Sequence, residues 1–320
     1  MRHVRAGYRT RNGFVAAVDD VSLTINDDEV LGIAGESGCG KSTLVKVLYG
    51  DLGGPLTLAG GTVKASFRDD SADASRRDPV LRDDARIAEL WWDRISYVPQ
   101  GSMSVLNPVM RIESQIVDAL PRRLRRQGRG ALRQRLVEFL EELALPATVL
   151  RAYPHQLSGG MRQRVLVAMA AFPNPDLSLA DEPTTALDVI VQKRILIMLA
   201  TIQRRQRNSL VIVSHDLGVH YQITDRVAIA YAGKLIELAP TEALFRHPGH
   251  PYTRALIEAI PRVGENVRRS GLEGRPPDLS APPSGCRFSE RCPEVQDICR
   301  RASPELVEKS PGRHVACHFR

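Results

Sequence analysis

Short apolar runs alternate with turn-forming residues through the first part of the chain. Residues 21–25 and 29–34 have the length and apolar content of strands, and the Asn and Asp residues at 26–28 are typical of a turn between them. Glycines follow the second run directly. Residues 41–49 then carry leucine and valine at helical spacing. The pattern predicts a strand, a glycine-rich loop and a helix in succession.

Three more apolar runs are expected to be buried strands, at residues 95–98, 177–180 and 210–214. Ser178 interrupts one of them, although strands covered on both faces are usually apolar throughout. An apolar helix is predicted over 190–202. Strands that alternate with helices favour an α/β fold with a mostly parallel sheet covered on both faces.

The composition is that of a folded protein rather than a disordered one. Hydrophobic residues make up 43% of the 320 residues and charged residues 25%, which allows a sizeable buried core. The length favours one large domain with an appendage, or two moderate domains. Residues 271–285 contain four prolines and are typical of a linker that leads to the last part of the chain.

Lysine and arginine outnumber aspartate and glutamate by 44 to 37, which gives a net charge of +7. This excess suits anionic partners such as nucleotides, acidic lipids or nucleic acids, and it serves solubility equally well. Residues 121–145 form a basic stretch with helical character. We expect its arginines to form a solvated helix face, with contact to anionic lipid headgroups as the alternative; they are Arg122, Arg123, Arg125, Arg126, Arg129, Arg133 and Arg135.

No run approaches the roughly 18 apolar residues of a membrane span, and the first ten residues contain no apolar stretch. The chain is therefore expected to remain in the cytosol, where structural disulfides are rare. Four of the five cysteines nevertheless lie in the last part of the chain, at Cys286, Cys292, Cys299 and Cys317. This clustering suggests a function of its own.

Residues 35–42 follow the pattern glycine, four residues, glycine, lysine, serine, between a predicted strand and a predicted helix; they are Gly35, Glu36, Ser37, Gly38, Cys39, Gly40, Lys41 and Ser42. Glycines let the backbone bend until its N–H groups point at phosphate oxygens, and the start of the helix adds partial positive charge. Lys41 would supply a charge to the β and γ phosphates, and Ser42 a hydroxyl to Mg²⁺. The motif predicts binding of a nucleoside triphosphate with magnesium.

Two carboxylates, Asp181 and Glu182, follow the predicted strand at 177–180. Ligands of open parallel sheets bind at the carboxyl ends of strands. One carboxylate can organise the magnesium shell while the other reaches the water that attacks the γ phosphate. Read alone, the pair could equally be two acids at an exposed strand end.

Three further features are each only a weak indication of a nucleotide site when taken alone. Ser158, Gly159 and Gly160 precede an apolar helical run and could form a second anion-binding helix start. His215 follows the predicted strand at 210–214, where it could contact a γ phosphate. Gln100 follows the strand at 95–98, where it could contact magnesium or water. Each also occurs as an ordinary turn, surface or loop residue.

Taken together, these motifs resemble the ATP-binding subunits of ABC transporters in their order and approximate spacing, over about the first 240 residues. The signature Leu157 to Gln163 excludes most other classes with a phosphate loop. Four more segments look like the dipeptide/oligopeptide permease subfamily, at residues 106–110, 153–157, 183–189 and 250–256. The last of them lies beyond the ATPase core.

The resemblance implies a role for each matching residue. The phosphate loop and Thr43 bind ATP, while Ser42, Gln100 and Asp181 serve Mg²⁺. Glu182 polarises the attacking water and His215 senses the γ phosphate. Two subunits share each site, since the 158–160 turn closes on ATP held by the opposite subunit and Asp188 connects across the interface. Tyr8 occupies the place of the aromatic residue that stacks on adenine, with Phe14 as the alternative.

The resemblance also implies the architecture. We expect a P-loop NTPase fold with a RecA-like core and antiparallel β and α-helical subdomains, the helical one at about 101–170. The ATP-binding domain would cover residues 1–260. Residues 261–320 would form a small cysteine-containing C-terminal extension of the peptide-permease type.

The four tail cysteines lack the Cys-x₂₋₄-Cys spacing of zinc ribbons and the spacings of ferredoxins. Some peptide-permease ATPases carry such cysteines as ligands of a [4Fe–4S] cluster, so the resemblance implies that cluster here. Zinc is the second expectation, with His314 and His318 as further ligands, and free thiols are the third. Cys39 belongs to the phosphate loop and is left out of this set.

The implied function is ATP hydrolysis that energises import of di- or oligopeptides. The implied partners are two membrane-spanning permease subunits, a second ATPase, by resemblance a paralogue, and, indirectly, an extracytoplasmic substrate-binding protein, with no nucleic acid. The chain would lie at the cytoplasmic face of the membrane, contacting the permease through residues 101–112. A nickel or oligosaccharide importer, or a soluble ABC ATPase acting on nucleic acid or ribosomes, is the alternative.

Overall fold

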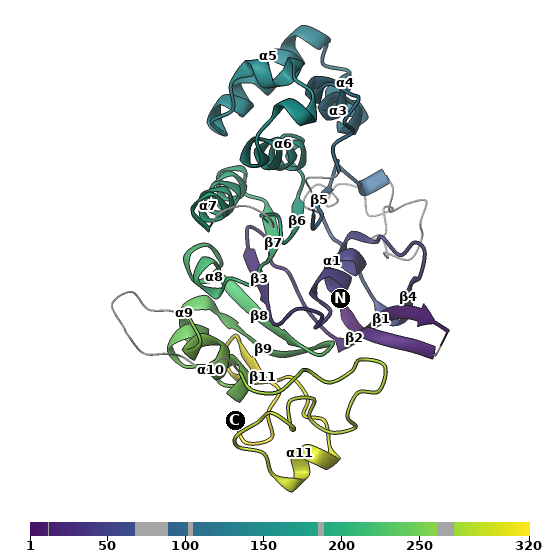
Figure 1. Ribbon diagram of the computed structural model, residues 1–320, viewed down its shortest axis with the longest axis vertical. Helices are drawn as coiled ribbons and strands as arrows, with labels where there is room; N and C mark the ends of the chain where they lie inside the picture. Colours follow the sequence, from purple (N-terminus) through teal and green to yellow (C-terminus); the bar gives the residue numbers. More distant parts are fainter. Residues whose placement is uncertain (12, 68–88, 102–104, 185–188, 261–271) are drawn as a thin grey trace. The chain divides into compact units, whose positions relative to one another are not determined.

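The computed structural model describes residues 1–320 except 12, 68–88, 102–104, 185–188 and 261–271. It contains two compact units (Figure 1). The first unit consists of Met1–Thr24, Leu31–Lys64 and Val213–Arg320, and the second of Ile25–Val30 and Ala65–Ile212. No helix among the described residues is both long and apolar enough to cross a lipid bilayer.

A three-stranded antiparallel sheet belongs to the first unit. Its order is β2-β1-β4, with β1 at Arg2–Thr10, β2 at Gly13–Val21 and β4 at Leu56–Thr62. Val4 and Ala6 of β1 are buried with the exposed Arg5 between them, as expected for a sheet with one covered face.

Five further strands of the first unit pair in the order β10-β11-β9-β8-β3. Strand β3 (Val30–Ala34) runs parallel to β8 (Arg226–Tyr231), and all five of its residues are buried, which explains its continuous apolar run. Strand β9 (Lys234–Pro240) is antiparallel to β8. The C-terminal strands β10 (Val307–Ser310) and β11 (Arg313–Val315) extend the sheet beyond β9.

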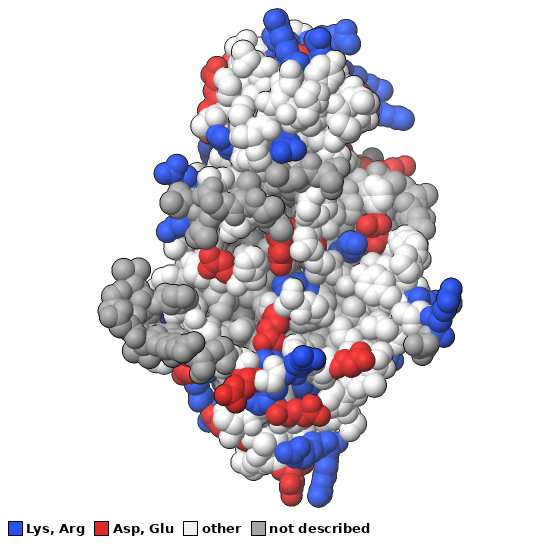
Figure 2. Space-filling view, in the orientation of Figure 1, with Lys and Arg blue, Asp and Glu red and all other residues white. Residues whose placement is uncertain are grey.

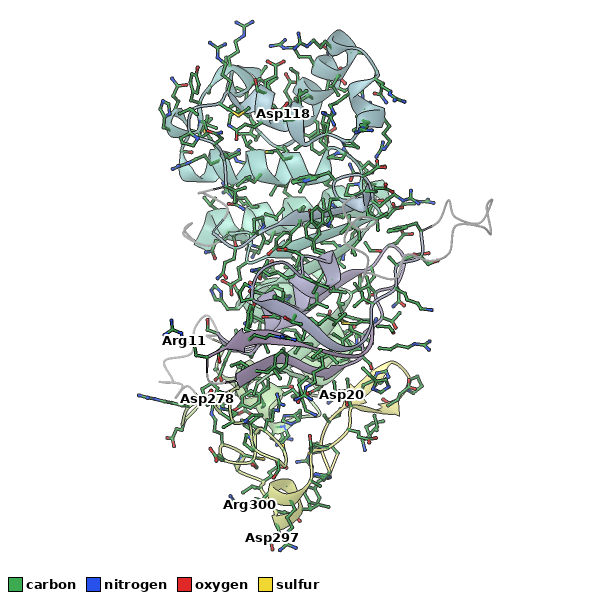
Figure 3. All side chains as sticks on the ribbon, turned by 90° about the vertical axis from the view of Figure 1, so that its right-hand side faces the viewer. Arg11, Asp20, Asp118, Asp278, Asp297 and Arg300 are labelled. Atoms are coloured by element: carbon green, nitrogen blue, oxygen red, sulfur yellow. The ribbon has the colours of Figure 1, made fainter. Side chains whose placement is uncertain are left out.

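Helices complete the first unit: α1 (Lys41–Tyr49), α8 (Leu217–Ile223), α9 (Thr241–Arg246), α10 (Pro251–Glu258) and α11 (Asp297–Arg301). A core of aromatic and aliphatic side chains joins β8 and β9 to the C-terminal part of the chain, and it includes Tyr231, Tyr252 and Phe288. Asp297 and Arg300 are exposed on α11, while Cys299 between them is buried (Figure 3).

The second unit combines strands β5 (Ile95–Val98), β6 (Leu177–Asp181) and β7 (Ser209–Val213) with a group of helices. Strands β5 and β6 are parallel, with Val98 opposite Ala180. The helices are α3 (Ile112–Ala119), α4 (Arg122–Arg125), α5 (Arg129–Glu142), η3 (Ala147–Arg151), η4 (Pro154–Gln156), α6 (Gly159–Ala171) and α7 (Val189–Gln206). One apolar core draws buried residues from all of them except η4.

Most of the elements predicted from hydrophobic periodicity are confirmed. Helix α1 (Lys41–Tyr49) and β5 (Ile95–Val98) have their predicted bounds, and β3, β6, β7 and α7 lie within one to four residues of theirs. The strand predicted over 21–25 is wrong, because β2 ends at Val21. The basic stretch forms two helices instead of one, since Gly128 adopts a φ of 89° between them.

Basic side chains gather over the helices α4 and α5 of the second unit (Figure 2). The seven arginines of this stretch are exposed. Several of them have partners within the unit: Arg123 pairs with Asp93 at 2.5 Å, and Arg133 with Glu113 at 3.1 Å. These contacts support a solvated helix face.

Candidate nucleotide-binding site

The glycine-rich loop joins the end of β3 to the start of α1 within the first unit. Gly35 and Gly40 have φ values of 150° and 102°, which residues with a side chain rarely adopt. A Cβ at Gly35 would lie 2.1 Å from the Ala230 carbonyl oxygen, and one at Gly40 would lie 1.9 Å from that of Ala17. Both positions therefore require glycine, as the motif predicts.

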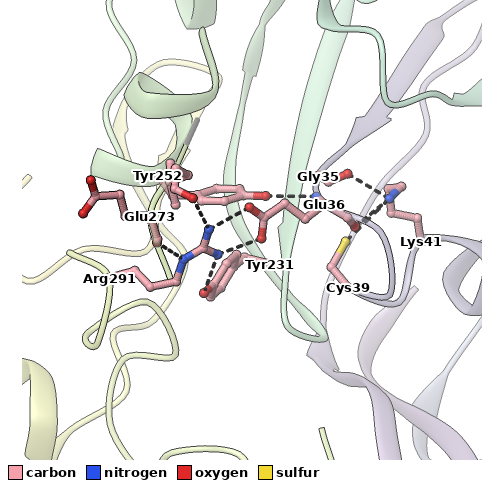
Figure 4. Close-up of polar contacts among 9 residues, drawn as sticks. Gly35, Glu36, Cys39, Lys41, Tyr231, Tyr252, Glu273 and Arg291 are labelled. Atoms are coloured by element: carbon pink, nitrogen blue, oxygen red, sulfur yellow. Dashed lines mark hydrogen bonds and ion pairs between the residues drawn. The ribbon is translucent and has the colours of Figure 1, made fainter. Parts of the chain in front are cut away.

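Lys41 is the first residue of α1, and its side chain folds back over the loop (Figure 4). Its ammonium group donates to the carbonyl oxygens of Gly35 and Glu36, both at 2.8 Å, and the residue is 5% exposed. Charge at Nζ and the N–H groups at the start of α1 together make this loop attractive to an anion. Ser42 and Thr43 lie in the first turn of the same helix.

Tyr8 contacts the helix that follows the loop. Its hydroxyl lies 3.1 Å from Thr43 Oγ1. In the antiparallel pair of β1 and β2, Tyr8 is opposite Val15 while Arg9 is opposite Phe14. Directly opposed residues share a face, and neighbouring residues alternate. Tyr8 and Phe14 therefore lie on opposite faces of the sheet, and Tyr8 is on the face that contacts α1.

The second unit brings the two expected carboxylates to one edge of its parallel strands. Asp181 ends β6 and is 1% exposed, with the Tyr97 hydroxyl donating to its Oδ2 at 3.4 Å. Gln100, two residues beyond β5, donates its amide N–H to Glu182 Oε2 at 3.1 Å. Glu182 adopts a φ of 43°, in the left-handed region, so the chain turns sharply after β6.

Ser158, Gly159 and Gly160 form the start of α6, also in the second unit. Ser158 is the N-cap, and its Oγ accepts from the Met161 N–H at 3.3 Å. Ser158 is exposed and both glycines are partly exposed. A Cβ at Gly160 would lie 3.4 Å from Val191 Cγ1. The turn is a capped, accessible helix start, as its sequence predicts.

His215 follows β7 and belongs to the first unit, where it is exposed. The next residue, Asp216, caps α8 by accepting from the N–H groups of Gly218 and Val219. His220 on that helix is fully buried, and its Nε2 donates to the Ser214 carbonyl oxygen at 3.1 Å. Burial lowers the pKa of His220 to about 4. Asp188 lies outside the described residues, as do Ala186 and Leu187.

Two residues near the phosphate loop escape prediction from sequence. Arg291 forms an ion pair with Glu36, and the Tyr252 hydroxyl accepts a hydrogen bond from the Glu36 N–H. Tyr252 lies in the segment 250–256, which resembles the peptide-permease subfamily, so this motif is the available signal. No local pattern marks Arg291.

The four C-terminal cysteines line one small apolar pocket together with residues such as Phe288 and His250. None of the four forms a disulfide. Burial raises the pKa of the Cys286 and Cys292 thiols. No group of three or more His, Cys, Asp or Glu side chains is placed to hold a metal ion in the part of the chain that the structure describes.

Comparison with known proteins agrees with the site. The model of the ABC transporter family matches residues 18–185, and the model of the oligopeptide/dipeptide transporter C-terminal region matches residues 236–299. The dipeptide transport ATP-binding protein DppD of Bacillus subtilis is 36% identical over 99% of this chain and 93% of its own length. The oligopeptide transport ATP-binding protein OppD of Salmonella typhimurium is 37% identical over 98% of this chain and 91% of its own length.

Solved structures show the same fold. The dimeric structure of MJ0796, a bacterial ABC transporter cassette, has a TM-score of 0.62 and 26% sequence identity, covering 75% of this chain and 97% of that one. A post-hydrolysis state of the same cassette with ADP and Pi bound gives equal values. The expected α/β P-loop NTPase fold is therefore confirmed.

The expected [4Fe–4S] cluster is wrong. The described residues offer no metal-binding group, and the relatives named above are not iron–sulfur proteins by name. The same geometry leaves the zinc alternative without a ligand set among the described residues.

The phosphate loop, the paired carboxylates and the capped Ser-Gly-Gly turn are explained together by one family. Relatives more than 30% identical match over nearly the whole chain, and the family model covers more than half of it. The chain is an ATPase and belongs to the ABC transporter family.

Proposed function

We propose that this ATPase energises the import of di- or oligopeptides through a membrane transporter. The observation that carries the proposal is the match of residues 236–299 to the oligopeptide/dipeptide transporter C-terminal region. Relatives named for dipeptide and oligopeptide transport support it. We also propose the division into an ATP-binding domain, 1–260, with its helical subdomain at about 101–170, and a C-terminal extension, 261–320.

In this function ATP binds at the phosphate loop, with Lys41 neutralising the β and γ phosphates and the loop N–H groups donating to their oxygens. Tyr8, whose hydroxyl contacts Thr43 on the helix after the loop, stacks on adenine in this proposal. Glu182 polarises the attacking water, and His215 contacts the γ phosphate. Ser158, Gly159 and Gly160, with Asp188, serve the site of an opposing ATPase subunit.

The residues assigned to magnesium fit that ion, which prefers oxygen ligands. Ser42 offers a hydroxyl and Asp181 a carboxylate at the end of β6. The Gln100 side-chain nitrogen donates to Glu182, so the side-chain oxygen of Gln100 is the atom that would bind the ion. When bound, the ion neutralises phosphate charge.

The partners follow from the proposed import function. The chain would work with a second ATPase, a paralogue, and with two membrane-spanning permease subunits contacted through residues 101–112 at the cytoplasmic face. Val105 and Val109 in that segment are 53% and 79% exposed, which supports an apolar contact surface there. A substrate-binding protein would act on the permease from the other side.

Uptake by cells tests the proposal. A strain that carries only Lys41→Ala in place of the natural chain should lose uptake of a labelled dipeptide, while a strain with Lys64→Ala, which changes an exposed lysine, should retain it. Uptake of labelled nickel and of a trisaccharide is measured in the same strains. Loss of either of these with normal dipeptide uptake would replace the peptide assignment by the corresponding substrate.

A further inference from the structure

An ion pair joins the C-terminal part of the chain to the phosphate loop (Figure 4). Arg291 Nη1 lies 2.7 Å from Glu36 Oε2, and Nη2 lies 2.8 Å from Glu36 Oε1. The Arg291 side chain is 4% exposed and that of Glu36 is 24% exposed. The two residues are 255 positions apart in the sequence. A bidentate pair of this kind fixes the orientation of both groups.

Other contacts orient the Arg291 guanidinium. Its Nε donates to the Glu273 carbonyl oxygen at 2.9 Å, and Nη1 donates to the Tyr231 hydroxyl at 3.2 Å. Nη2 also donates to the Leu272 carbonyl oxygen at 3.4 Å. The fork that faces Glu36 is therefore set by the first unit itself, and it does not depend on a flexible surface side chain.

Tyr252 holds the backbone of the same glutamate. Its hydroxyl accepts from the Glu36 N–H at 3.0 Å. The ring is fully buried and packs on Tyr231 and Phe288, with centroid distances of 4.6 and 5.4 Å. Burial raises the pKa of Tyr252, so the phenol stays neutral. Glu36 is thus held at its N–H and at both carboxylate oxygens.

The position of Tyr252 is set by a buried chain of hydrogen bonds. His250 caps α10, with Nδ1 accepting from the Tyr252 N–H at 3.0 Å. Glu237 on β9 is fully buried and accepts from the N–H groups of Gly249 and His250, at 2.7 and 2.9 Å. The segment 250–256 therefore places a hydroxyl against the phosphate loop.

These contacts matter most when nucleotide binds. Lys41 donates to the Gly35 and Glu36 carbonyl oxygens, and it must leave them to reach a phosphate. The loop then loses two hydrogen bonds that maintain its shape. The contacts of Glu36 with Arg291 and Tyr252 remain, and the guanidinium also neutralises a carboxylate close to the triphosphate.

We propose that Arg291 and Tyr252 are positioning residues for ATP binding: by holding Glu36, they keep the phosphate loop in its binding shape after Lys41 turns to the nucleotide. This inference rests on the assignment of residues 35–42 as the ATP site. Neither residue touches the phosphates, so their loss should weaken ATP binding more than turnover.

Steady-state ATPase assays of the full chain test this with Arg291→Ala. The KM for ATP should rise at least about 10-fold, while kcat at saturating ATP stays within about twofold. Arg254→Ala is the matched control, because Arg254 forms an ion pair with Glu294 in the same C-terminal region. This control should retain the KM of the natural chain. An unchanged KM for Arg291→Ala would overturn the proposal.

A double variant separates positioning from simple stabilisation of the tail. If Arg291 acts through Glu36, the double variant Arg291→Ala/Glu36→Ala should have the same KM as Glu36→Ala alone. The reason is that Glu36→Ala already removes the contact through which Arg291 acts. Additive effects would show that Arg291 acts otherwise and would contradict the proposal.

Tyr252→Phe keeps the inference testable should Arg291→Ala fail to fold, because it removes one hydroxyl and retains the buried ring. Its KM should rise about threefold, and an unchanged KM refutes the role of Tyr252. Lys41→Ala tests the ATP site separately from the role of Arg291. Normal ATP binding by Lys41→Ala would contradict the assignment of residues 35–42 as the ATP site. Weakened ATP binding by Lys41→Ala together with an unchanged KM for Arg291→Ala would contradict only the positioning role of Arg291.

Discussion

Gln100 donates its amide N–H to Glu182 Oε2 at 3.1 Å, joining the residues that follow two neighbouring parallel strands. The two residues are 82 positions apart in the sequence. The contact fixes one oxygen of Glu182, which is partly exposed. A carboxylate held in this way is oriented to accept a proton from water.

We expect Glu182→Gln to reduce ATP turnover at least about 100-fold, because the neutral amide cannot polarise the attacking water and single groups of this kind contribute that much. ATP binding should remain, since Glu182 is not a phosphate ligand. Phosphate release and nucleotide binding are measured side by side. Glu138→Gln, an exposed glutamate of α5, is the control. Turnover equal in both variants would remove Glu182 from its proposed role.

Lys41→Ala should weaken ATP binding itself, by at least about 10-fold, because the variant lacks the charge that faces the phosphates. Titration with a fluorescent ATP analogue measures this directly. Lys64→Ala removes an exposed lysine of the same unit and should bind as the natural chain does. Equal affinity in the two variants would show that another group holds the phosphates.

Two glycines with positive φ values allow the effect of backbone conformation on stability to be distinguished from the effect of a steric clash. Gly54 has a φ of 69°, and a Cβ added there would meet nothing within 4 Å, whereas a Cβ at Gly40, with a φ of 102°, would lie 1.9 Å from the Ala17 carbonyl oxygen. We expect Gly54→Ala to lower the free energy of unfolding by about 1 kcal/mol. Gly40→Ala should lower it by about 2 kcal/mol more, through the added clash. Urea unfolding without nucleotide gives both values, and equal losses would contradict the close approach.

Buried histidines should make the first unit sensitive to acid. Burial lowers the pKa of His220 from 6.5 to about 4 and that of His250 to about 3. The unfolded chain therefore binds these protons more readily than the folded chain. The stability contribution is complete above pH 6.5 and is lost as the pH falls towards 4, by about 3 kcal/mol for His220.

Urea unfolding at pH 7, 5.5 and 4.5 measures this loss. His220→Gln should show a shallower decrease, because an amide N–H can replace the Nε2 donor to Ser214 without titrating. An equal decrease in the natural chain and the variant would assign the acid sensitivity to other groups.

The glycine-rich loop and the strand and helix on either side of it are predicted almost completely from the sequence. Glycines at 35 and 40 are required by contacts with Ala230 and Ala17, and the pattern of the motif encodes that requirement without the contacts being known. Helix α1 is predictable because its apolar positions follow one helical period.

Antiparallel strands are harder to predict. Strands β1 and β2 do not keep a regular alternation of buried and exposed residues, and the pairing between them contains register shifts. Ser178 departs from the apolar pattern of a buried strand, yet it is satisfied by Ser96 Oγ at 3.0 Å and Gln203 Nε2 at 2.8 Å. Such partners, 82 and 25 residues away, are set by the fold.

In the C-terminal region, Arg291 is not predicted from the sequence, and the metal cluster predicted for the cysteines is wrong. Arg291 lies 255 residues from Glu36, so no spacing rule links them. The cysteines suggest a metal because of their number, but ligand sets depend on directions and distances that counting does not provide.

The left-handed backbone of Glu182 has one further consequence. A glutamate at a φ of 43° has more backbone strain than a glycine would have at the same position. Glycine at this position would relieve the strain, but it would also remove the carboxylate that Gln100 holds. The carboxylate is therefore present at a cost of about 1 kcal/mol in folding stability.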